Sequence, residues 1–236
     1  MLQGHQGNFQ STLRVLVSRM TDKPYKEPKH AIPHLELIQL GVPTWNKWIQ
    51  GELTKEEAED VAAKLAPTPV PKPPSGSFID RANPVNFFGV DFTKGENSLI
   101  TFAGALFGDG ANFQRARFGD EANFQSATFG DDADFQSATF GNISNFQSAT
   151  FGDDADFLSA TFGDVADFQS ATFGGGVNFQ GATLGDGADF QSVIFNDKAN
   201  FQSVTFGDRA DFQSATFGGG ANFSGSSPAN RREVMK

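Results

Sequence analysis

Aspartate is the residue type with the most obvious chemical potential in this 236-residue chain, because it recurs at regular spacing. One set follows a glycine or asparagine at multiples of 11 residues, and a second set directly precedes a phenylalanine. The first set is Asp109, Asp120, Asp131, Asp153, Asp164, Asp186, Asp197 and Asp208, and the second is Asp134, Asp156, Asp167, Asp189 and Asp211. Clustered carboxylates can bind Ca²⁺, repel nucleic acid or keep a protein surface dispersed. The choice depends on the elements that position them.

Other chemistry-bearing residue types give no catalytic pattern. The histidines, His5, His30 and His34, lie near the N-terminus, and Pro33 interrupts the helical spacing of the last two. We therefore interpret them as surface residues rather than metal ligands. Serine recurs in nearly every repeat, which argues against a unique nucleophile, and the glycine runs open no helix. The sequence predicts a protein that is not an enzyme, with no catalytic, cofactor-binding or metal-binding residues and no cofactor.

The aspartates are carried by a phenylalanine repeat that runs from Phe102 to Phe223. An aromatic returns at alternating gaps of five and six residues, and 22 of the 23 positions are Phe, the exception being Leu184. Two positions earlier stands a small residue, which is Ala in 18 of the 23 cases. Residues i and i+2 of an extended segment share a face, so Ala and Phe point inward while Thr128 or Asp134 points to water. Each unit is therefore predicted to be one short strand, since this spacing leaves no apolar stripe on a helix.

Polar turn formers separate the units, so the chain is predicted to coil as a solenoid. Gln-Ser follows most of one alternate set of aromatics and Gly-Asp-x follows most of the other set, and both favour turns. Two 11-residue units would close a 22-residue coil with four faces, giving a rod about 28 Å long at ~4.8 Å per stacked strand. The alternative is a flattened 11-residue coil with two faces. The four-faced coil is favoured because only a square section leaves room for inward rings.

Units such as Ala122-Asn123-Phe124-Gln125-Ser126, followed by Ala127-Thr128-Phe129-Gly130-Asp131, resemble the pentapeptide repeat family. The resemblance covers residues 85–223. Every second unit carries a sixth residue, as in a Phe-rich branch of that family. The resemblance implies an all-β solenoid, a right-handed quadrilateral β-helix, here with a small helical N-terminal segment.

The rest of the chain divides by composition. We predict a flexible leader over 1–33, a short helical segment over 34–66, a Pro-rich linker over 67–77, the repeat over 78–223 and a polar tail over 224–236. Thr54 and Glu57 form a capping-box pattern at the start of a helix. Residues 34–50 resemble a leader found ahead of the repeats in other family members. Trp45 and Trp48 are expected to cap the first coil; a ligand-stacking platform and a separate module are the alternatives.

The repeat breaks its own pattern at a few places, to which we assign no function. Residues 93–97 occupy a missing face and predict a bulged loop. Leu158 replaces a surface Gln, Ile143-Ser144 disturbs an Ala position, and Arg115 with Arg117 places positive charge near the N-terminal coils. The C-terminal end of the solenoid is expected to be exposed, which makes it a candidate surface for a homodimer.

Charge separates the two parts of the chain. Residues 1–76 carry nine basic and eight acidic residues, whereas residues 78–225 carry six and nineteen, a net charge of −13. The acidic surface could serve solubility, mimic DNA or bind calcium through Asp131, Asp132 and Asp134. DNA mimicry is implied by the resemblance, since several family members that bind DNA gyrase present an acidic rod. Those members dimerise through a C-terminal helix, which this sequence does not visibly contain.

The function predicted from the sequence is a protein-binding or scaffold module with an unknown protein partner. The alternative is a DNA-mimic modulator of a DNA-binding enzyme such as DNA gyrase. An acidic rod would repel nucleic acid, so no direct nucleic-acid binding is expected. The chain has no cysteine, no apolar stretch of signal-peptide type and no run of the ~20 apolar residues that span a bilayer. We therefore expect a cytoplasmic protein with no membrane contact.

Overall fold

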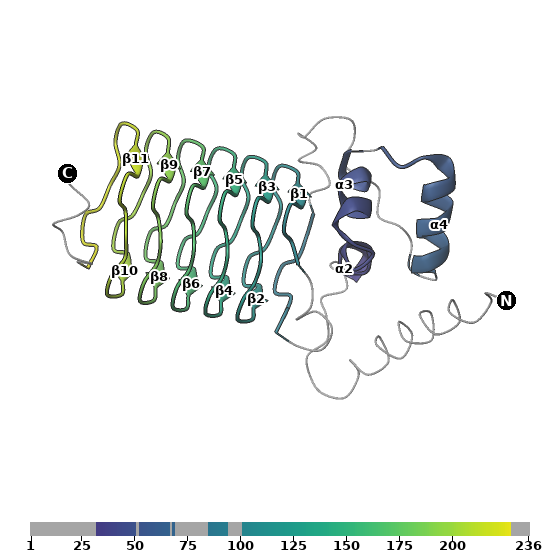
Figure 1. Cartoon of the computed structure of the whole chain (residues 1–236), viewed down its shortest axis with the longest axis horizontal. Helices are drawn as coiled ribbons and strands as arrows, with labels where there is room; N and C mark the ends of the chain where they lie inside the picture. Colours follow the sequence, from purple (N-terminus) through teal and green to yellow (C-terminus); the bar gives the residue numbers. More distant parts are fainter. Residues whose placement is uncertain (1–31, 51, 67, 69–84, 94–100, 228–236) are drawn as a thin grey trace.

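The computed structural model describes residues 32–50, 52–66, 68, 85–93 and 101–227. A helical segment at one end is followed by a regular β-solenoid (Figure 1). The predicted leader over 1–33 and the predicted linker over 67–77 lie almost wholly outside the described residues, and so do residues 94–97 of the predicted bulged loop.

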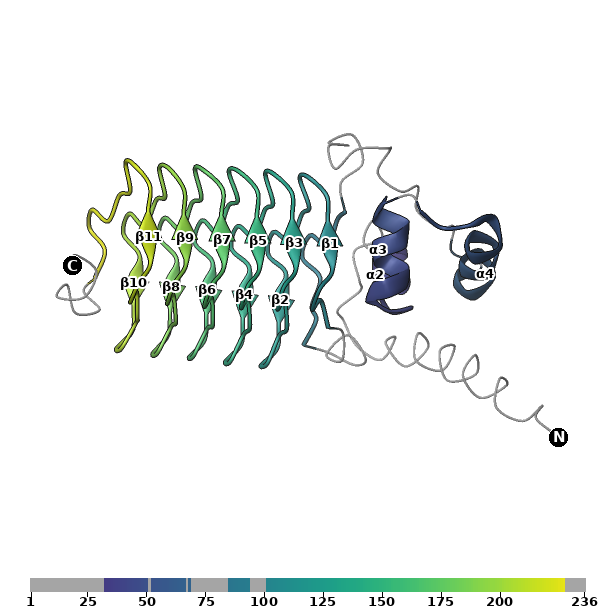
Figure 2. The ribbon, with the colours of Figure 1, turned by 45° about the horizontal axis from the view of Figure 1, so that its top comes forward.

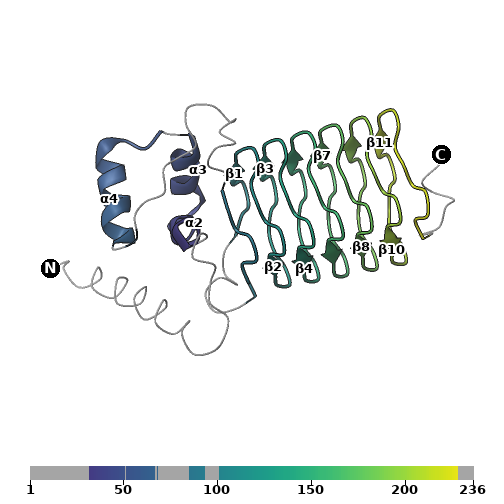
Figure 3. The same ribbon diagram turned by 180° about the vertical axis from the view of Figure 1, so that it is seen from behind.

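The solenoid contains two parallel sheets built from two-residue strands. Figure 1 shows the odd-numbered strands along one side and the even-numbered strands along the other, and Figure 3 shows the same arrangement from behind. The strands are β1 (Leu106–Phe107), β2 (Arg117–Phe118), β3 (Thr128–Phe129), β4 (Thr139–Phe140), β5 (Thr150–Phe151), β6 (Thr161–Phe162), β7 (Thr172–Phe173), β8 (Thr183–Leu184), β9 (Ile194–Phe195), β10 (Thr205–Phe206) and β11 (Thr216–Phe217).

Strand pairing fixes the length of the coil. Thr128 pairs with Thr150 and Phe129 pairs with Phe151, so each residue lies against the residue 22 positions later. The odd strands form a six-stranded sheet and the even strands form a five-stranded sheet. The 22-residue coil with four faces is confirmed, and the 11-residue alternative is wrong. Figure 2 shows both rows of strands running the length of the solenoid.

Only every second unit forms a strand, which corrects the prediction that each unit does. The strands lie in the six-residue units, whereas the five-residue units contribute isolated bridges such as Asn112 to Asp134 and Asn123 to Asn145. In the five-residue units the residue with positive φ comes two positions after the aromatic, as at Ser126 (φ 55°) after Phe124. In the six-residue units it comes three positions after the aromatic, as at Asp132 (φ 57°) after Phe129. In the five-residue units the chain therefore leaves the extended conformation too early for a continuous ladder.

The core consists of phenylalanine rings stacked along the solenoid axis. Phe124 and Phe146 have ring centroids 4.8 Å apart and parallel planes, and Phe146 repeats this arrangement with Phe168. Rings on adjacent faces meet edge to face, as for Phe118 and Phe124 at 5.1 Å. Most alanines two positions before a ring are fully buried, which confirms their predicted inward orientation. Leu184 is buried as well and interrupts one ring column.

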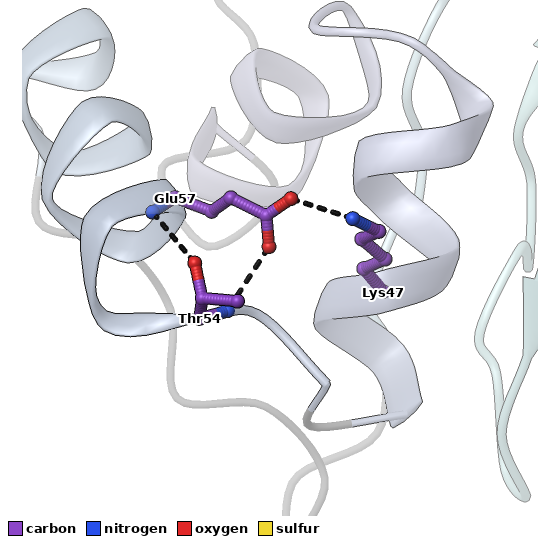
Figure 4. A network of polar contacts seen from close by, with 3 residues as sticks. All are labelled: Lys47, Thr54 and Glu57. Atoms are coloured by element: carbon purple, nitrogen blue, oxygen red, sulfur yellow. Dashed lines mark hydrogen bonds and ion pairs between the residues drawn. The ribbon is translucent and has the colours of Figure 1, made fainter.

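The helical segment contains α2 (Ile32–Ile38), α3 (Val42–Gln50) and α4 (Lys55–Leu65). Gly41 lies between the first two helices with φ +105°, a conformation that favours glycine. The predicted capping box begins α4: the Thr54 hydroxyl accepts from Glu57 N–H, and the Glu57 carboxylate accepts from Thr54 N–H (Figure 4). Lys47 of α3 donates to the same carboxylate at 2.5 Å, which ties α4 to α3 and lowers the pKa of Glu57.

Helix α3 lies against the first coil of the solenoid. The Trp45 indole N–H donates to Leu106 O at 2.7 Å. The Asn46 side chain accepts from Leu106 N–H at 2.8 Å and donates to Gly104 O at 2.9 Å. Asn46 therefore supplies to the first coil a donor and an acceptor, as a neighbouring strand would. Trp45 also packs against Phe107 with centroids 5.7 Å apart. Among the described residues, no helix has the length and apolar character needed to cross a membrane.

Candidate functional site

The aspartates that follow the corner glycines are part of the backbone framework. With a 22-residue coil they fall into two columns, one containing Asp131 and Asp153 and the other containing Asp164 and Asp186. Asp131 Oδ1 accepts from the backbone N–H of Asp153 at 2.9 Å, and Asp164 Oδ1 accepts from that of Asp186 at 3.0 Å. One oxygen of each carboxylate is thus used to join successive coils.

This use of the aspartate explains the glycine before it. A Cβ added to Gly152 would lie 2.4 Å from Asp131 Oδ1 and 2.6 Å from Asp131 N. The carboxylate of one coil therefore occupies the space that a side chain on the next coil would need. Asn196 replaces the glycine at the position equivalent to Gly152. In the coil before it, Gly175 takes the place of the aspartate, so no carboxylate fills the space that the Asn196 side chain needs. The Gly-Asp pair is a packing unit of the solenoid.

The aspartates that precede an aromatic close the turns of the five-residue units. Asp134 Oδ1 accepts from Gln136 N–H at 3.0 Å. Asparagine does the same at the equivalent position one coil earlier, where Asn112 Oδ1 accepts from Gln114 N–H at 2.9 Å. Because the amide oxygen suffices for this hydrogen bond, the turn does not need a charge. The negative charge of the aspartates at these positions is surplus to this turn hydrogen bond.

Three of these carboxylates lie in consecutive coils of one column: Asp167, Asp189 and Asp211. Successive coils are close together, as shown by the 4.9 Å between the Phe168 and Phe190 ring centroids. Burial raises the pKa of Asp189, and the charges of Asp167 and Asp211 raise it further. The column therefore keeps negative charges together at an electrostatic cost.

The column that contains Asp134 and Asp156 shows the same effect. Burial is the largest cause of a raised pKa at Asp134, and the charge of Asp156 adds to it. Glutamine amides partly offset the repulsion: Gln114 donates to Asp134, and Gln136 donates to Asp156 Oδ2 at 2.6 Å. In the next coil the column carries Asn178 instead of an aspartate, and its side-chain amide donates to Asp156 Oδ1 at 3.1 Å.

The geometry of Asp131, Asp132 and Asp134 gives the calcium interpretation no support. Asp131 Oδ1 is engaged with the next coil, and Asp134 Oδ1 is engaged with its own turn. Among the described residues, no group of three or more His, Cys, Asp or Glu side chains could hold a metal ion.

His34 corrects one prediction, because it is a buried residue of α2 and not a surface histidine. Its ring lies 5.8 Å from the Trp48 ring and 6.1 Å from the Phe87 ring, and 7 % of the residue is exposed. The prediction was wrong because Pro33 does not prevent a helix here. Helix α2 starts at Ile32, so Pro33 lies in the first turn, where proline is tolerated. His5 and His30 lie outside the described residues. Trp45 and Trp48 are buried, so neither ring is open to stack on a ligand.

The irregular positions of the repeat have different surroundings. Leu158 is half-buried, and Arg115 lies 5.8 Å from the centroid of the Phe88 ring. Ser144 takes an inward Ala position, and its buried Oγ has no hydrogen-bond partner. Ile143 is 54 % exposed, and Val165, which the sequence reasoning overlooked, is 51 % exposed one coil later. The overlooked signal is a β-branched residue at a corner that elsewhere carries Asp, Glu, Gly, Lys or Arg.

The comparisons with known proteins agree with this architecture. A family model described as pentapeptide repeats (9 copies) matches residues 102–147, 146–194 and 179–227, which together cover more than half of the chain. Comparisons with curated proteins and with solved structures gave no match. With its stacked four-faced coils and this family match, the chain belongs to the pentapeptide repeat family.

Proposed function

We propose that this protein is a non-enzymatic, cytoplasmic binding module whose acidic solenoid recognises a basic surface on a partner protein. Pentapeptide-repeat solenoids generally serve as structural or interaction modules, which supports the proposal. The observation that carries it is the surplus charge at the turn positions of the five-residue units. Aspartate is used there although asparagine makes the same backbone hydrogen bond in neighbouring coils.

Solubility alone does not account for this placement of charge. A solubilising charge works anywhere on a surface and is cheapest where it is fully solvated. The carboxylates of Asp134 and Asp189 are instead half-buried, and each faces another carboxylate one coil away, which raises its pKa. A basic partner surface would relieve this repulsion. The arrangement therefore favours a role in binding over a role in dispersal.

The sequence supplies a neutral variant that should preserve the fold. Asp134, Asp156, Asp167, Asp189 and Asp211 are replaced by asparagine together, which removes five charges and keeps an Oδ1 acceptor at every turn. Wild-type and neutral chains are used as baits in pull-downs at rising salt, with thermal unfolding as the control for folding. We expect a partner that leaves the wild type as salt rises and is not retained by the neutral chain. A partner retained equally by both chains would contradict the proposal.

DNA mimicry is a second candidate, favoured by the columns of carboxylates at constant spacing along a solenoid. Family members that bind DNA gyrase resemble this chain in having an acidic rod. The test is a supercoiling assay with purified DNA gyrase, run with the wild-type and neutral chains and with DNA added as competitor. Mimicry predicts that only the wild type inhibits and that DNA relieves the inhibition. Supercoiling unaffected by either chain excludes this enzyme as the target.

We also propose that the protein forms a homodimer through the C-terminal coil of the solenoid. Phe217 and Phe223 of this coil are half-buried, whereas rings in the middle of the solenoid are fully buried. Pairing continues past the last aromatic, since Ser227 N–H donates to Val204 O at 2.9 Å. Because α3 packs against the first coil at the opposite end, association through the last coil would stop at a dimer. Sedimentation at several concentrations tests this, and a monomer at all of them would refute it.

A further inference from the structure

One corner of the solenoid carries two exposed apolar side chains, Ile143 and Val165, in adjacent coils. They are 54 % and 51 % exposed. The coils that carry them are close, since the Phe140 and Phe162 rings just before this corner are 4.7 Å apart. Gly187 is next in this row, since a Cβ added to it would lie 3.9 Å from Val165 Cγ2. Because glycine has no side chain, the apolar row ends at Val165. We call Ile143 and Val165 the apolar ridge.

The backbone makes the choice of these residues unfavourable. Ile143 has φ +59° and Val165 has φ +60°, in the left-handed region that β-branched residues avoid. Glycine, which is free of this strain, occupies the same column at Gly187. Since both side chains are more than half exposed, packing within the solenoid does not repay the strain. Strained residues that the fold does not require point to a role outside the fold.

The surroundings of the apolar ridge define its partner. Val165 lies between Asp164, which is exposed, and Asp167, which is half-buried, whereas Asn142 and Asn145 hold the same places beside Ile143. Asp186 and Asp189 follow in the next coil. The carboxylates beside Val165 and beyond it favour positive charge, while the ridge itself favours an apolar side chain. We propose that the apolar ridge docks a partner-protein segment in which leucine or valine is flanked by lysine or arginine. This inference rests on the proposed function, because it specifies where on the acidic solenoid the basic partner binds.

The test uses two synthetic heptapeptides of equal charge as probes. Lysine alternates with leucine and valine in the first and with serine and threonine in the second. Binding to the full chain is measured by fluorescence anisotropy. We expect the apolar peptide to bind about tenfold more tightly, the effect of burying one or two aliphatic side chains. Replacing Ile143→Asn and Val165→Asn together should abolish this preference and leave the thermal midpoint unchanged or higher, because asparagine tolerates positive φ.

A matched control comes from Ile194, which is 45 % exposed on β9. Thr172 and Thr216 occupy its column, so Ile194→Thr restores the regular pattern. The preference for the apolar peptide should survive this change. A preference that survives the ridge substitutions, or that Ile194→Thr removes as well, would overturn the inference.

The outcomes separate the ridge from the proposed function. If the wild type binds both peptides equally and both are lost in the five-asparagine chain, charge binding stands and the ridge proposal fails. If neither peptide binds, both proposals fail. A wild-type dimer that the ridge substitutions dissociate would show that the ridge binds a second copy of this chain, which also overturns the proposal.

Discussion

Phe168→Ala tests the stacked-ring core most directly. Phe168 lies in the middle of the solenoid and has no exposed surface. Its ring stacks between those of Phe146 at 4.8 Å and Phe190 at 4.9 Å, and it meets Phe162 edge to face at 5.4 Å. Removing the ring leaves a cavity enclosed by other rings and by the coil wall.

The expected loss in the free energy of unfolding is large. Truncating a buried phenylalanine costs about 3 to 5 kcal/mol, with larger losses where the surroundings cannot collapse. Here the ladders on both sides fix the coil spacing, so we expect the upper half of this range, about 4 to 5 kcal/mol. Phe168→Leu should cost only about 1.5 kcal/mol or less, because Leu184 already occupies the equivalent place in another column.

Urea unfolding followed by circular dichroism measures both losses, with Gln169→Ala as the matched control. Gln169 is half-buried on the outside of the same coil, where it accepts a hydrogen bond from Gln147 at 2.9 Å. Its removal should cost about 0.5 to 1.5 kcal/mol at most. Equal losses for Phe168→Ala and Gln169→Ala would refute the inward assignment of the rings.

Three further predictions test other parts of the structure. Ser144→Ala should raise the free energy of unfolding by about 1 to 2 kcal/mol, because it removes a buried hydroxyl without a hydrogen-bond partner; urea unfolding measures this, and a loss of stability would contradict it. Trp45→Ala should speed hydrogen exchange at Leu106 in the first coil while leaving Phe168 protected, because it removes the indole bond to Leu106 O and uncovers this end of the solenoid; uniform protection would refute the capping role. Asp189→Asn should stabilise the protein near neutral pH, because the native carboxyl has a pKa raised above 3.8 and is costly to ionise. As pH falls through that raised pKa the wild type regains this stability, so the gap between the two chains should narrow from pH 7 to pH 4; a constant gap in urea unfolding would show that charge is not the cause.

The sequence by itself determined the architecture of the repeat and the start of the last helix. A Phe every five or six residues, with Ala two positions earlier, predicts a solenoid with inward rings, because extended units joined by turns keep both residues on one face. The space that the rings need favoured the 22-residue coil over the 11-residue coil, and the pairing of residues 22 positions apart decided between them. The pattern at Thr54 and Glu57 identified the start of α4, since capping depends only on residues three positions apart.

The tertiary structure decided what the local pattern could not express. The role of Asp131 in joining coils depends on a backbone N–H 22 residues away, and the burial of His34 depends on rings brought to the first coil from a distant part of the chain. The surplus charge at Asp134 became visible only when an asparagine turn was found to have the same hydrogen bond. Likewise, Ile143 and Val165 are 22 residues apart, and only coiling places them side by side on a strained corner. Spacing along a chain fixes which side chains share a face, whereas contacts between coils fix which of them remain available to a partner.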